Sequence, residues 1–267
     1  MPILHAIVLG IVQGLSEFLP ISSSGHLELT RWAFGWDSLP EDLETSFDVA
    51  VHLGTLLGAI TYLRHDVVRY LTAGFAPLRR ESLETDGRIA WFLVVSAVPA
   101  GLTGVLLKDQ IADLDSIWMI ALMLIVFGLV LLVADRLPER RELTEFRLRD
   151  ALAMGVGQAF ALQPGVSRSG ATLTVSRALG FERDAAARLV FLMSLPIIAG
   201  AGVFALSDAS IPSDFWPPFL WGMASSAITG WLAVWGTLRL VRSRSFSRFV
   251  AYRVGLGFVV LIALAVG

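Results

Sequence analysis

Long apolar segments separated by short charged segments dominate this sequence of 267 residues. A helix that spans a bilayer needs about 20 predominantly apolar residues. Six segments approach this length, over residues 47–63, 89–107, 117–134, 185–206, 215–238 and 249–266. The pattern therefore predicts an all-α integral membrane protein with six transmembrane helices.

Two further apolar segments are interrupted by polar turns and do not fit a full span. Residues 3–34 are interrupted by Pro-Ile-Ser-Ser-Ser-Gly at 20–25, and residues 151–180 by Pro-Gly-Val-Ser-Arg-Ser-Gly at 164–170. A short helix, a Gly/Ser turn and a second short helix favour a re-entrant hairpin. Irregular backbone at membrane depth is tolerated only where it is buried in protein or lines a wet cavity.

Arginine is concentrated in three connections, and this distribution predicts the orientation. Segments 64–88, 136–149 and 239–253 hold five arginines each, whereas segment 35–46 is acidic. Because basic connections stay on the cytoplasmic side, residues 1–46 and the C-terminus are expected outside. The first hairpin then enters from outside and the second from the cytoplasm, so the two turns point at each other.

Composition agrees with a membrane protein and excludes some kinds of site. The chain is 55% hydrophobic and only 16% charged, whereas a soluble domain averages about 25% charged residues. The absence of cysteine excludes disulfides and thiolate metal sites. The formal net charge of -2 gives no indication of nucleic acid as a partner.

The two interrupted segments match each other at a constant offset of 145 residues. In the shared register, Gly10, Gln13, Ser22, Ser24 and Gly25 recur as Gly155, Gln158, Ser167, Ser169 and Gly170. Small residues match easily by chance, but the gapless register agrees with the predicted opposite insertion. We therefore interpret residues 1–267 as one membrane domain made of two inverted repeats, 1–134 and 150–267. Such repeats commonly place a site near the bilayer midplane, between broken helices.

Arg168 is the residue of the second turn that is most costly to bury. An arginine at the bilayer centre costs about 2.5–3.5 kcal/mol even on the more lenient scale. It lies between Ser167 and Ser169, where a half-helix begins. Helix N-terminal amides, hydroxyls and a guanidinium together are suited to binding an anion. The alternative is a structural ion pair with Glu17 across the two repeats.

Glu17 is the carboxylate of the first hairpin. It follows Gln13 by four residues, so both side chains project from one helical face. A buried carboxylate can transfer protons, orient water or hold a divalent cation. The alternative is a structural glutamate that caps the nearby turn.

Three consecutive hydroxyls follow, at Ser22, Ser23 and Ser24, next to the imidazole of His26. A serine becomes a nucleophile when a base lies beside it, and phosphoryl transfer needs an in-line nucleophile. The alternative is ordinary capping of the following half-helix, for which serine is well suited. One serine can cap the helix while another reacts.

Three residues in neighbouring helices are weaker candidates. Asp48 and His52 lie one turn apart in the first full span and are expected to face the interior of the bundle. Their alternative role is a hydrogen bond between helices. Thr172 lies one turn after Arg168 and is expected to face the site.

The two turns carry long motifs. They read Gln-Gly-Leu-Ser-Glu-Phe-Leu-Pro-Ile-Ser-Ser-Ser-Gly-His-Leu over 13–27 and Pro-Gly-Val-Ser-Arg-Ser-Gly-Ala-Thr over 164–172. The chain resembles the undecaprenyl-diphosphate phosphatase family of the bacitracin-resistance type in these two motifs, in the spacing between them and in chain length. The resemblance implies hydrolysis of undecaprenyl diphosphate to undecaprenyl phosphate and phosphate. This reaction recycles the carrier lipid for bacterial cell-wall synthesis and confers bacitracin resistance.

The resemblance also implies the site and its surroundings. The residues that match the family's catalytic group are Glu17, Ser23, His26 and Arg168, and its supporting residues are matched by Ser167 and Thr172. Our expected substrate-binding set adds Gln13, Ser22, Ser24, Asp48 and Ser169. The family further implies two inward-facing re-entrant hairpins and a site open to the external face of the bacterial plasma membrane. It also implies a divalent cation, Mg²⁺ or Ca²⁺, for which Glu17 is the candidate ligand.

One residue departs from the common family pattern, and it affects the expected mechanism. Many members have Glu where this chain has Gln13, and Gln cannot act as a base or a charged metal ligand. We therefore expect Glu17 to take the roles of base and charged metal ligand. Arg168 would hold the diphosphate, while Ser23 or a water, assisted by His26, would attack the terminal phosphorus.

A transporter of the lipid phosphate is the rival interpretation, because inverted repeats with broken helices are transporter architecture. The Ser/His/Glu cluster favours chemistry, since a carrier needs no nucleophile. The expected partners are an isoprenoid lipid diphosphate and membrane lipid, without nucleic acid. The sequence leaves a homodimer open.

Overall fold

The computed structural model describes residues 1–36, 39–76, 84–107, 116–207, 211–241 and 245–266. Within these ranges the chain is helical and has no β-strand beyond a single bridge between Arg141 and Phe181. The helices are α1 Ile3–Glu17, α2 Ser23–Phe34, α3 Glu41–Tyr62, α4 Arg64–Gly74, α5 Thr85–Val95, α6 Ala97–Leu106, α8 Ile117–Asp135, η2 Leu143–Glu145, α9 Leu148–Phe160, α10 Arg168–Ala178, α11 Arg183–Ser207, η3 Ser213–Phe215, α12 Trp216–Val241 and α13 Ser247–Val266. Parts of the acidic segment 35–46 and of the basic segments 64–88 and 239–253 lie outside the described residues.

Four helices among the described residues are long and apolar enough to cross a membrane. They are Thr85–Leu106, which comprises α5 and α6, Ile117–Asp135, Arg183–Ala205 and Ser247–Val266. Helices α3 and α4 meet at 86° and make a fifth if they count as one broken span. The chain is therefore a multi-pass membrane protein. Of residues 215–238, all except Phe215 lie in α12, which is not one of these four helices, so a crossing there stays a prediction.

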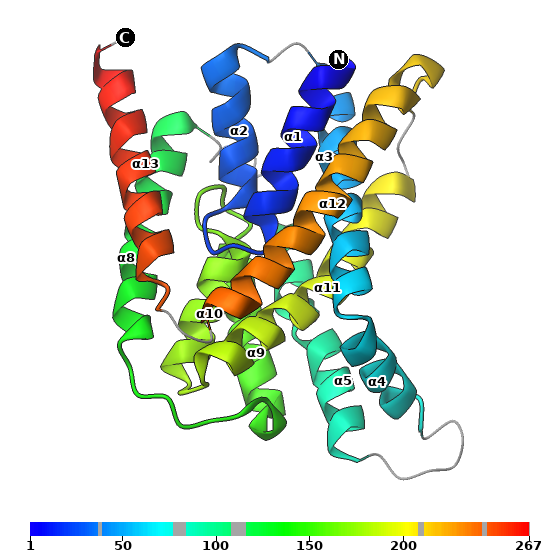
Figure 1. Ribbon diagram of the computed structural model, residues 1–267, viewed down its shortest axis with the longest axis vertical. Coiled ribbons are helices and arrows are strands. Elements are labelled where there is room, and N and C mark those ends of the chain that lie inside the picture. Colours follow the sequence, from blue (N-terminus) through cyan, green and yellow to red (C-terminus); the bar gives the residue numbers. More distant parts are fainter. Residues whose placement is uncertain (37–38, 77–83, 108–115, 208–210, 242–244, 267) are drawn as a thin grey trace.

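The two interrupted segments each fold as a pair of short helices joined by a turn. Figure 1 shows α1 and α2 in the upper half of the molecule and α9 and α10 in the lower half, with both termini at the upper end. The turns are in direct contact, as the sequence predicts. The amide of Gly165 donates to Ser22 Oγ at 3.1 Å, and Ser169 Oγ donates to the carbonyl of Leu19 at 2.8 Å.

Close helix packing sets the rotation of the helices that carry the site. A Cβ on Gly10 or Gly14 of α1 would lie 2.1 or 1.9 Å from a hydroxyl oxygen of α12. A Cβ on Gly54 of α3 would likewise lie 2.0 Å from Ser226 Oγ of α12. Small residues let helix backbones approach closely within membranes. This packing therefore fixes which side chains of α1 and α3 face the two turns.

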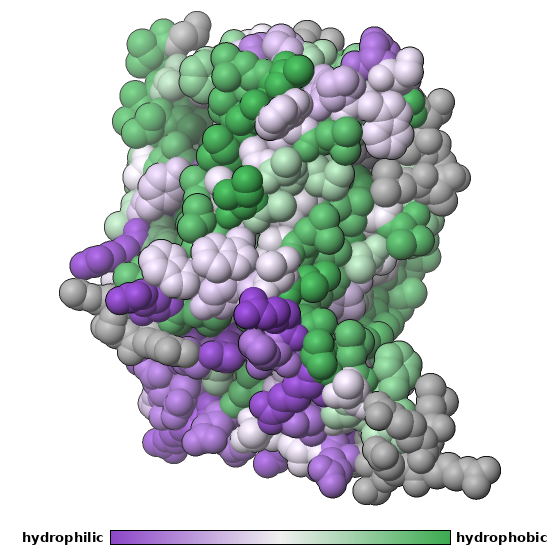
Figure 2. All heavy atoms as spheres, turned by 45° about the vertical axis from the view of Figure 1, so that its right-hand side comes forward, coloured by the Kyte–Doolittle hydropathy of each residue, from purple (hydrophilic) through white to green (hydrophobic). Residues whose placement is uncertain are grey.

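Polar side chains gather at the lower end of the molecule, below a largely apolar belt (Figure 2). Arg141 forms an ion pair with Asp150 at 2.5 Å, and this hydrogen-bonded carboxylate raises the pKa of the guanidinium. Arg177 of α10 is fully buried and donates to the carbonyls of Asp135 and Leu137 at the end of α8. These contacts hold the start of α9 and the end of α10 in place.

Candidate active site

A cavity of about 400 Å³ lies where the two turns meet. Its polar wall is formed by residues of the two hairpins together with three from α3: Glu17, Ser22, Ser23, Ser24, Thr45, Asp48, His52, Gln158, Ser167, Arg168 and Ser169. The opposite wall is mostly apolar and includes Val49, Leu162, Ile197 and Ile198. A polar pocket beside an apolar wall suits a ligand with a charged head and a hydrocarbon chain.

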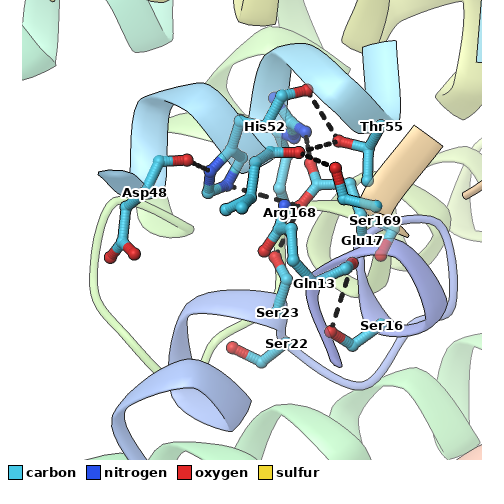
Figure 3. Close-up of polar contacts among 12 residues, drawn as sticks. Gln13, Ser16, Glu17, Ser22, Ser23, Asp48, His52, Thr55, Arg168 and Ser169 are labelled. Carbon is cyan, nitrogen blue, oxygen red and sulfur yellow. Dashed lines mark hydrogen bonds and ion pairs between the residues drawn. The ribbon is translucent and has the colours of Figure 1, made fainter. Parts of the chain in front are cut away.

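Glu17 is the centre of the polar wall. It is the last residue of α1, and its side chain is only 2% exposed. Its Oε2 accepts from Gln13 Nε2 at 2.8 Å and from Ser23 Oγ at 2.5 Å, while Oε1 is paired with the Arg168 guanidinium. Figure 3 shows these groups gathered around the carboxylate. A buried carboxylate with three donors is held ionised and in a fixed orientation.

The first turn places Ser23 against Glu17. Ser22 has a positive φ of 75°, which lets the chain reverse directly before α2. Its Oγ accepts from the amide of Gly25 at 3.4 Å and from that of Gly165 at 3.1 Å. Ser22 therefore caps α2 and joins the two turns, and Ser23, the first residue of α2, is left to bond Glu17. The capping alternative is therefore realised by Ser22, and a nucleophilic role for Ser23 stays a prediction.

The second turn repeats this arrangement with a different side chain at the key position. Ser167 has a φ of 73°, and its Oγ accepts from the amide of Gly170 at 3.1 Å. The next residue, Arg168, begins α10 and extends to Glu17. Its side chain is 22% exposed and lines the cavity, so part of the guanidinium is accessible to a ligand. The ion pair offered as the structural alternative is present, and it lies inside the cavity.

Comparisons with known proteins show the family of this chain. A family model described as bacitracin resistance protein BacA matches residues 6–259. The chain belongs to the BacA family. Among its relatives is an undecaprenyl-diphosphatase of Geobacter sulfurreducens, 45% identical over 270 residues that cover 99% of each chain. Another undecaprenyl-diphosphatase, from Nocardioides sp., is 44% identical over 272 residues, covering 99% of this chain and 97% of the relative.

His26 does not lie where the sequence interpretation of this BacA-family chain puts it. We expected the imidazole beside Ser23 as its base. Instead, Nδ1 faces the carbonyl of Ser22 at 2.7 Å, and Nε2 faces the hydroxyl of Tyr252 of α13 at 2.8 Å. The ring also stacks on Tyr252, with centroids 5.6 Å apart. His26 therefore braces the first turn against α13, and the group that contacts Ser23 is Glu17.

Three predicted binding residues do not present free polar groups to the cavity. The hydroxyl of Thr172 is fully buried and donates to the carbonyl of Arg168, so it supports α10 rather than lining the cavity. Asp48 lines the cavity, yet its carboxylate is paired with Arg31 of α2 and turns away from the other labelled residues in Figure 3. Gln13 lies behind Glu17, and its amide oxygen is buried without a hydrogen-bond partner.

Three residues of the site are missing from the set of site residues that the sequence predicts. His52 lines the cavity with Nε2 at 3.5 Å from Glu17 Oε2, although the sequence analysis offered it only as a weaker candidate. Arg31 holds Asp48. Arg253 of α13 is fully buried and donates to Pro20, Gly165 and Val166 carbonyls, so it binds both turns at once. No local motif marks these residues, because each acts across a long sequence separation.

The donor set of the cavity bears on the divalent cation that the family implies. Among the described residues, no group of three or more His, Asp and Glu side chains is placed to hold a metal. Glu17 and Ser23 nevertheless supply hard oxygen donors side by side. Mg²⁺ is often bound by one or two carboxylates together with substrate phosphates. Glu17 and Ser23 are therefore the residues that would hold such an ion together with the substrate.

Proposed function

We propose that this chain hydrolyses undecaprenyl diphosphate to undecaprenyl phosphate and phosphate. This function recycles the carrier lipid for bacterial cell-wall synthesis and confers bacitracin resistance. The observation that carries the proposal is the buried Glu17 carboxylate, which receives both the Ser23 hydroxyl and the Arg168 guanidinium. The names of its relatives support a phosphatase and do not favour a lipid transporter.

In this proposal each of the three groups has its own role. Arg168 extends from Glu17 toward the cavity and binds the diphosphate, because a guanidinium forms parallel hydrogen bonds with phosphate oxygens. Ser23 Oγ attacks the terminal phosphorus as Glu17 Oε2 accepts its proton, and the bond to the bridging oxygen breaks. The products of this step are phosphoserine and the lipid monophosphate, and water then hydrolyses the phosphoserine. Charge neutralisation and positioning account for most catalysis of phosphoryl transfer.

Two apolar features give the prenyl chain a path. The cavity wall opposite the carboxylate is apolar, and a second cavity of about 280 Å³ lies beside α3, α4, α5 and α11. The second cavity is lined almost entirely by apolar side chains, among them Leu56, Ile60, Leu195 and Ala199. These residues follow those of the first cavity along α3, and along α11 they lie next to them, mostly on the N-terminal side. The prenyl chain would therefore run from the polar pocket along these two helices.

The finer architecture is part of the proposal. Two features support an inverted repeat: the matched serine caps of the two turns and the placement of the hairpins in opposite halves (Figure 1). With α12 included, the chain would have six spans. The basic segments at the lower end favour a cytoplasmic lower face. We therefore place the protein in the bacterial plasma (inner) membrane, with the cavity open to the external, periplasmic face.

A divalent cation and a second copy of the chain complete the proposal. Glu17 and Ser23, together with the phosphates of the substrate, would hold Mg²⁺ or Ca²⁺. When bound, the ion would neutralise charge on the phosphoryl oxygens. Removing divalent ions with a chelator should then lower the rate, and adding them back should restore it. The homodimer stays a prediction from the sequence.

The deciding experiment measures phosphate release by the purified protein in detergent. Farnesyl and undecaprenyl diphosphate should both release one phosphate, whereas undecaprenyl monophosphate, which has no anhydride bond, should release none. The variant His65→Gln is a matched control, because His65 is exposed on α4 and outside the cavity. A folded protein that releases no phosphate from either diphosphate would rule out this function.

A further inference from the structure

The ionisable side chains at the cavity include a carboxylate that no arginine of the cavity wall neutralises. Among the described residues that line the cavity, the ionisable ones are Glu17, Asp48, His52 and Arg168. The guanidinium of Arg168 is paired with Glu17, which leaves the Asp48 carboxylate without an arginine partner in the wall. An uncompensated carboxylate there would repel an anionic substrate, and the repulsion is strong where little water screens it.

The cation that pairs with Asp48 is Arg31 of α2, which lies behind the cavity wall. Arg31 Nη1 donates to Asp48 Oδ2 at 3.2 Å and Nη2 donates to Oδ1, so the pair is bidentate. The Arg31 side chain is only 3% exposed and is not among the residues that line the cavity. Its guanidinium therefore acts on a ligand in the cavity through Asp48 and not by contact.

Two further carboxylates share the Arg31 guanidinium, but neither belongs to the cavity wall. Glu44 Oε1 lies 3.0 Å from Nη1, and Glu28 Oε1 lies 3.1 Å from the same nitrogen. Their side chains are 26% and 34% exposed, so water screens part of their charge. Of the three carboxylates, Asp48 is the one that lines the cavity and bonds both terminal nitrogens.

Apolar packing holds α2 against α3 independently of this ion pair. Leu27 of α2 and Phe47 and Val51 of α3 belong to one buried cluster, and each lies within about one helical turn of Arg31 or Asp48. Replacing a buried ion pair by uncharged groups of similar volume is often neutral for stability, whereas removing one partner is costly. We therefore expect the two helices to stay together when both charges of the pair are removed.

We propose that Arg31 is a positioning residue for substrate binding. It holds the Asp48 carboxylate away from the phosphate pocket and neutralises its charge, so that the wall accepts a diphosphate. The inference rests on the proposed function. In Figure 3 the Asp48 carboxylate points away from Glu17 and Arg168. Without Arg31, this carboxylate would be released beside the cavity, where it would oppose the phosphate oxygens that Arg168 attracts.

The test separates affinity for farnesyl diphosphate from turnover. Arg31→Met removes the cation and keeps a long side chain. It should raise KM at least about tenfold, the effect of one unscreened like charge. Its kcat should stay within about threefold of the parent, because binding alone is weakened. The equilibrium Kd, measured by calorimetry on the purified protein in detergent, should rise in parallel with KM.

A second substitution identifies the carboxylate that is responsible. Asp48→Asn added to Arg31→Met removes the released charge and should return KM and Kd to within about threefold of the parent. Glu44→Gln added to Arg31→Met is the matched control. It also neutralises a carboxylate that Arg31 contacts, but one outside the cavity wall, so KM and Kd should stay raised.

The outcomes distinguish this inference from the proposed function. A parent that binds farnesyl diphosphate but releases no phosphate contradicts the proposed function, and the Kd values still test Arg31. A folded Arg31→Met with the Kd of the parent overturns the inference. Equal rescue by Asp48→Asn and Glu44→Gln also overturns it.

The double variant Arg31→Met/Asp48→Asn decides the question if Arg31→Met alone does not fold. A pair whose charges cancel toward the substrate can be removed as a whole without loss of affinity. A folded double variant with the affinity of the parent therefore supports the inference. If its Kd is raised about tenfold or more, Arg31 or Asp48 contributes to binding in another way and the inference is wrong.

Discussion

The two turns share one backbone design and differ in the side chain that follows the cap. In each, a serine with positive φ accepts the amide of a glycine three residues later, at Ser22–Gly25 and Ser167–Gly170. The next residue is Ser23 in the first turn and Arg168 in the second. Both reach the same carboxylate, Glu17. The same frame therefore presents the proposed nucleophile on one side and the proposed phosphate-binding cation on the other.

Of the residues that distinguish the two turns, Ser23 should show the largest loss of activity when it is replaced. Ser23→Ala should lower kcat by about 10⁴-fold or more, as removal of a covalent nucleophile does. Trapping of labelled phosphate on the parent, but not on the variant, checks the covalent step. A variant that retains a tenth of the parent rate would show that water attacks directly, with Ser23 only orienting it.

Removal of the Glu17 carboxylate, which both turns contact, should cause the second-largest loss of activity. Glu17→Gln keeps hydrogen bonding but cannot accept a proton, so turnover should fall by about 10²- to 10⁴-fold. Gln13→Ala should cost less, because Gln13 only positions Glu17 through its amide. Steady-state rates of both folded variants provide the test. A turnover of Glu17→Gln close to that of the parent would mean that the carboxylate of Glu17 is structural.

The second turn is probed by Arg168→Lys, which keeps the charge and removes the planar guanidinium. We expect about a 100-fold loss of kcat/KM, comparable to removing one donor that stabilises developing charge. Arg168→Ala should lose at least as much. The measurement is hydrolysis by protein whose fold is verified by a thermal melt. A lysine variant within about threefold of the parent would exclude bidentate phosphate binding by this residue.

The smallest expected effect is a difference in stability between variants of the two capping serines, Ser22 and Ser167. Ser22→Ala and Ser167→Ala impose the same positive φ on alanine, but only Ser22 accepts a hydrogen bond from the other turn. Its loss leaves the buried amide of Gly165 without that acceptor. Ser22→Ala should therefore unfold more readily than Ser167→Ala, by about 1–3 kcal/mol for an unsatisfied group. Thermal melts in detergent compare them; equal melting temperatures would mean that this contact is not needed.

Local sequence patterns predicted the elements that depend on neighbouring residues. Apolar length identified the four helices that qualify as spans, and the two Gly/Ser interruptions identified both turns. The hydroxyl and arginine of these turns reach Glu17 because the backbone around them is set by nearby residues. The contact between Arg168 and Glu17 was foreseen as the structural alternative to anion binding, and it is present in the cavity.

Contacts that depend on how helices rotate against each other were not predictable in this way. His26 is three residues from Ser23, yet the angle of α2 turns its ring to Tyr252, which is 226 residues away. His52 and Asp48 were expected on one interior face. The packing of Gly54 on α12 brings His52 to Glu17, while the Asp48 carboxylate meets Arg31. A periodic pattern gives the buried side of a helix, not the partner each residue meets there.

The hydrogen bonds from Arg253 to the two turns have a consequence for protein engineering. Its guanidinium binds the carbonyl oxygens of Pro20, Gly165 and Val166, and every amino acid has such an oxygen. The hold on the turns is therefore independent of the side chains they present. In protein engineering, the backbone of the paired turns can be kept unchanged. The side chains at positions 23 and 168 can then be exchanged to install another chemistry at this site. Position 253 is the one to leave untouched.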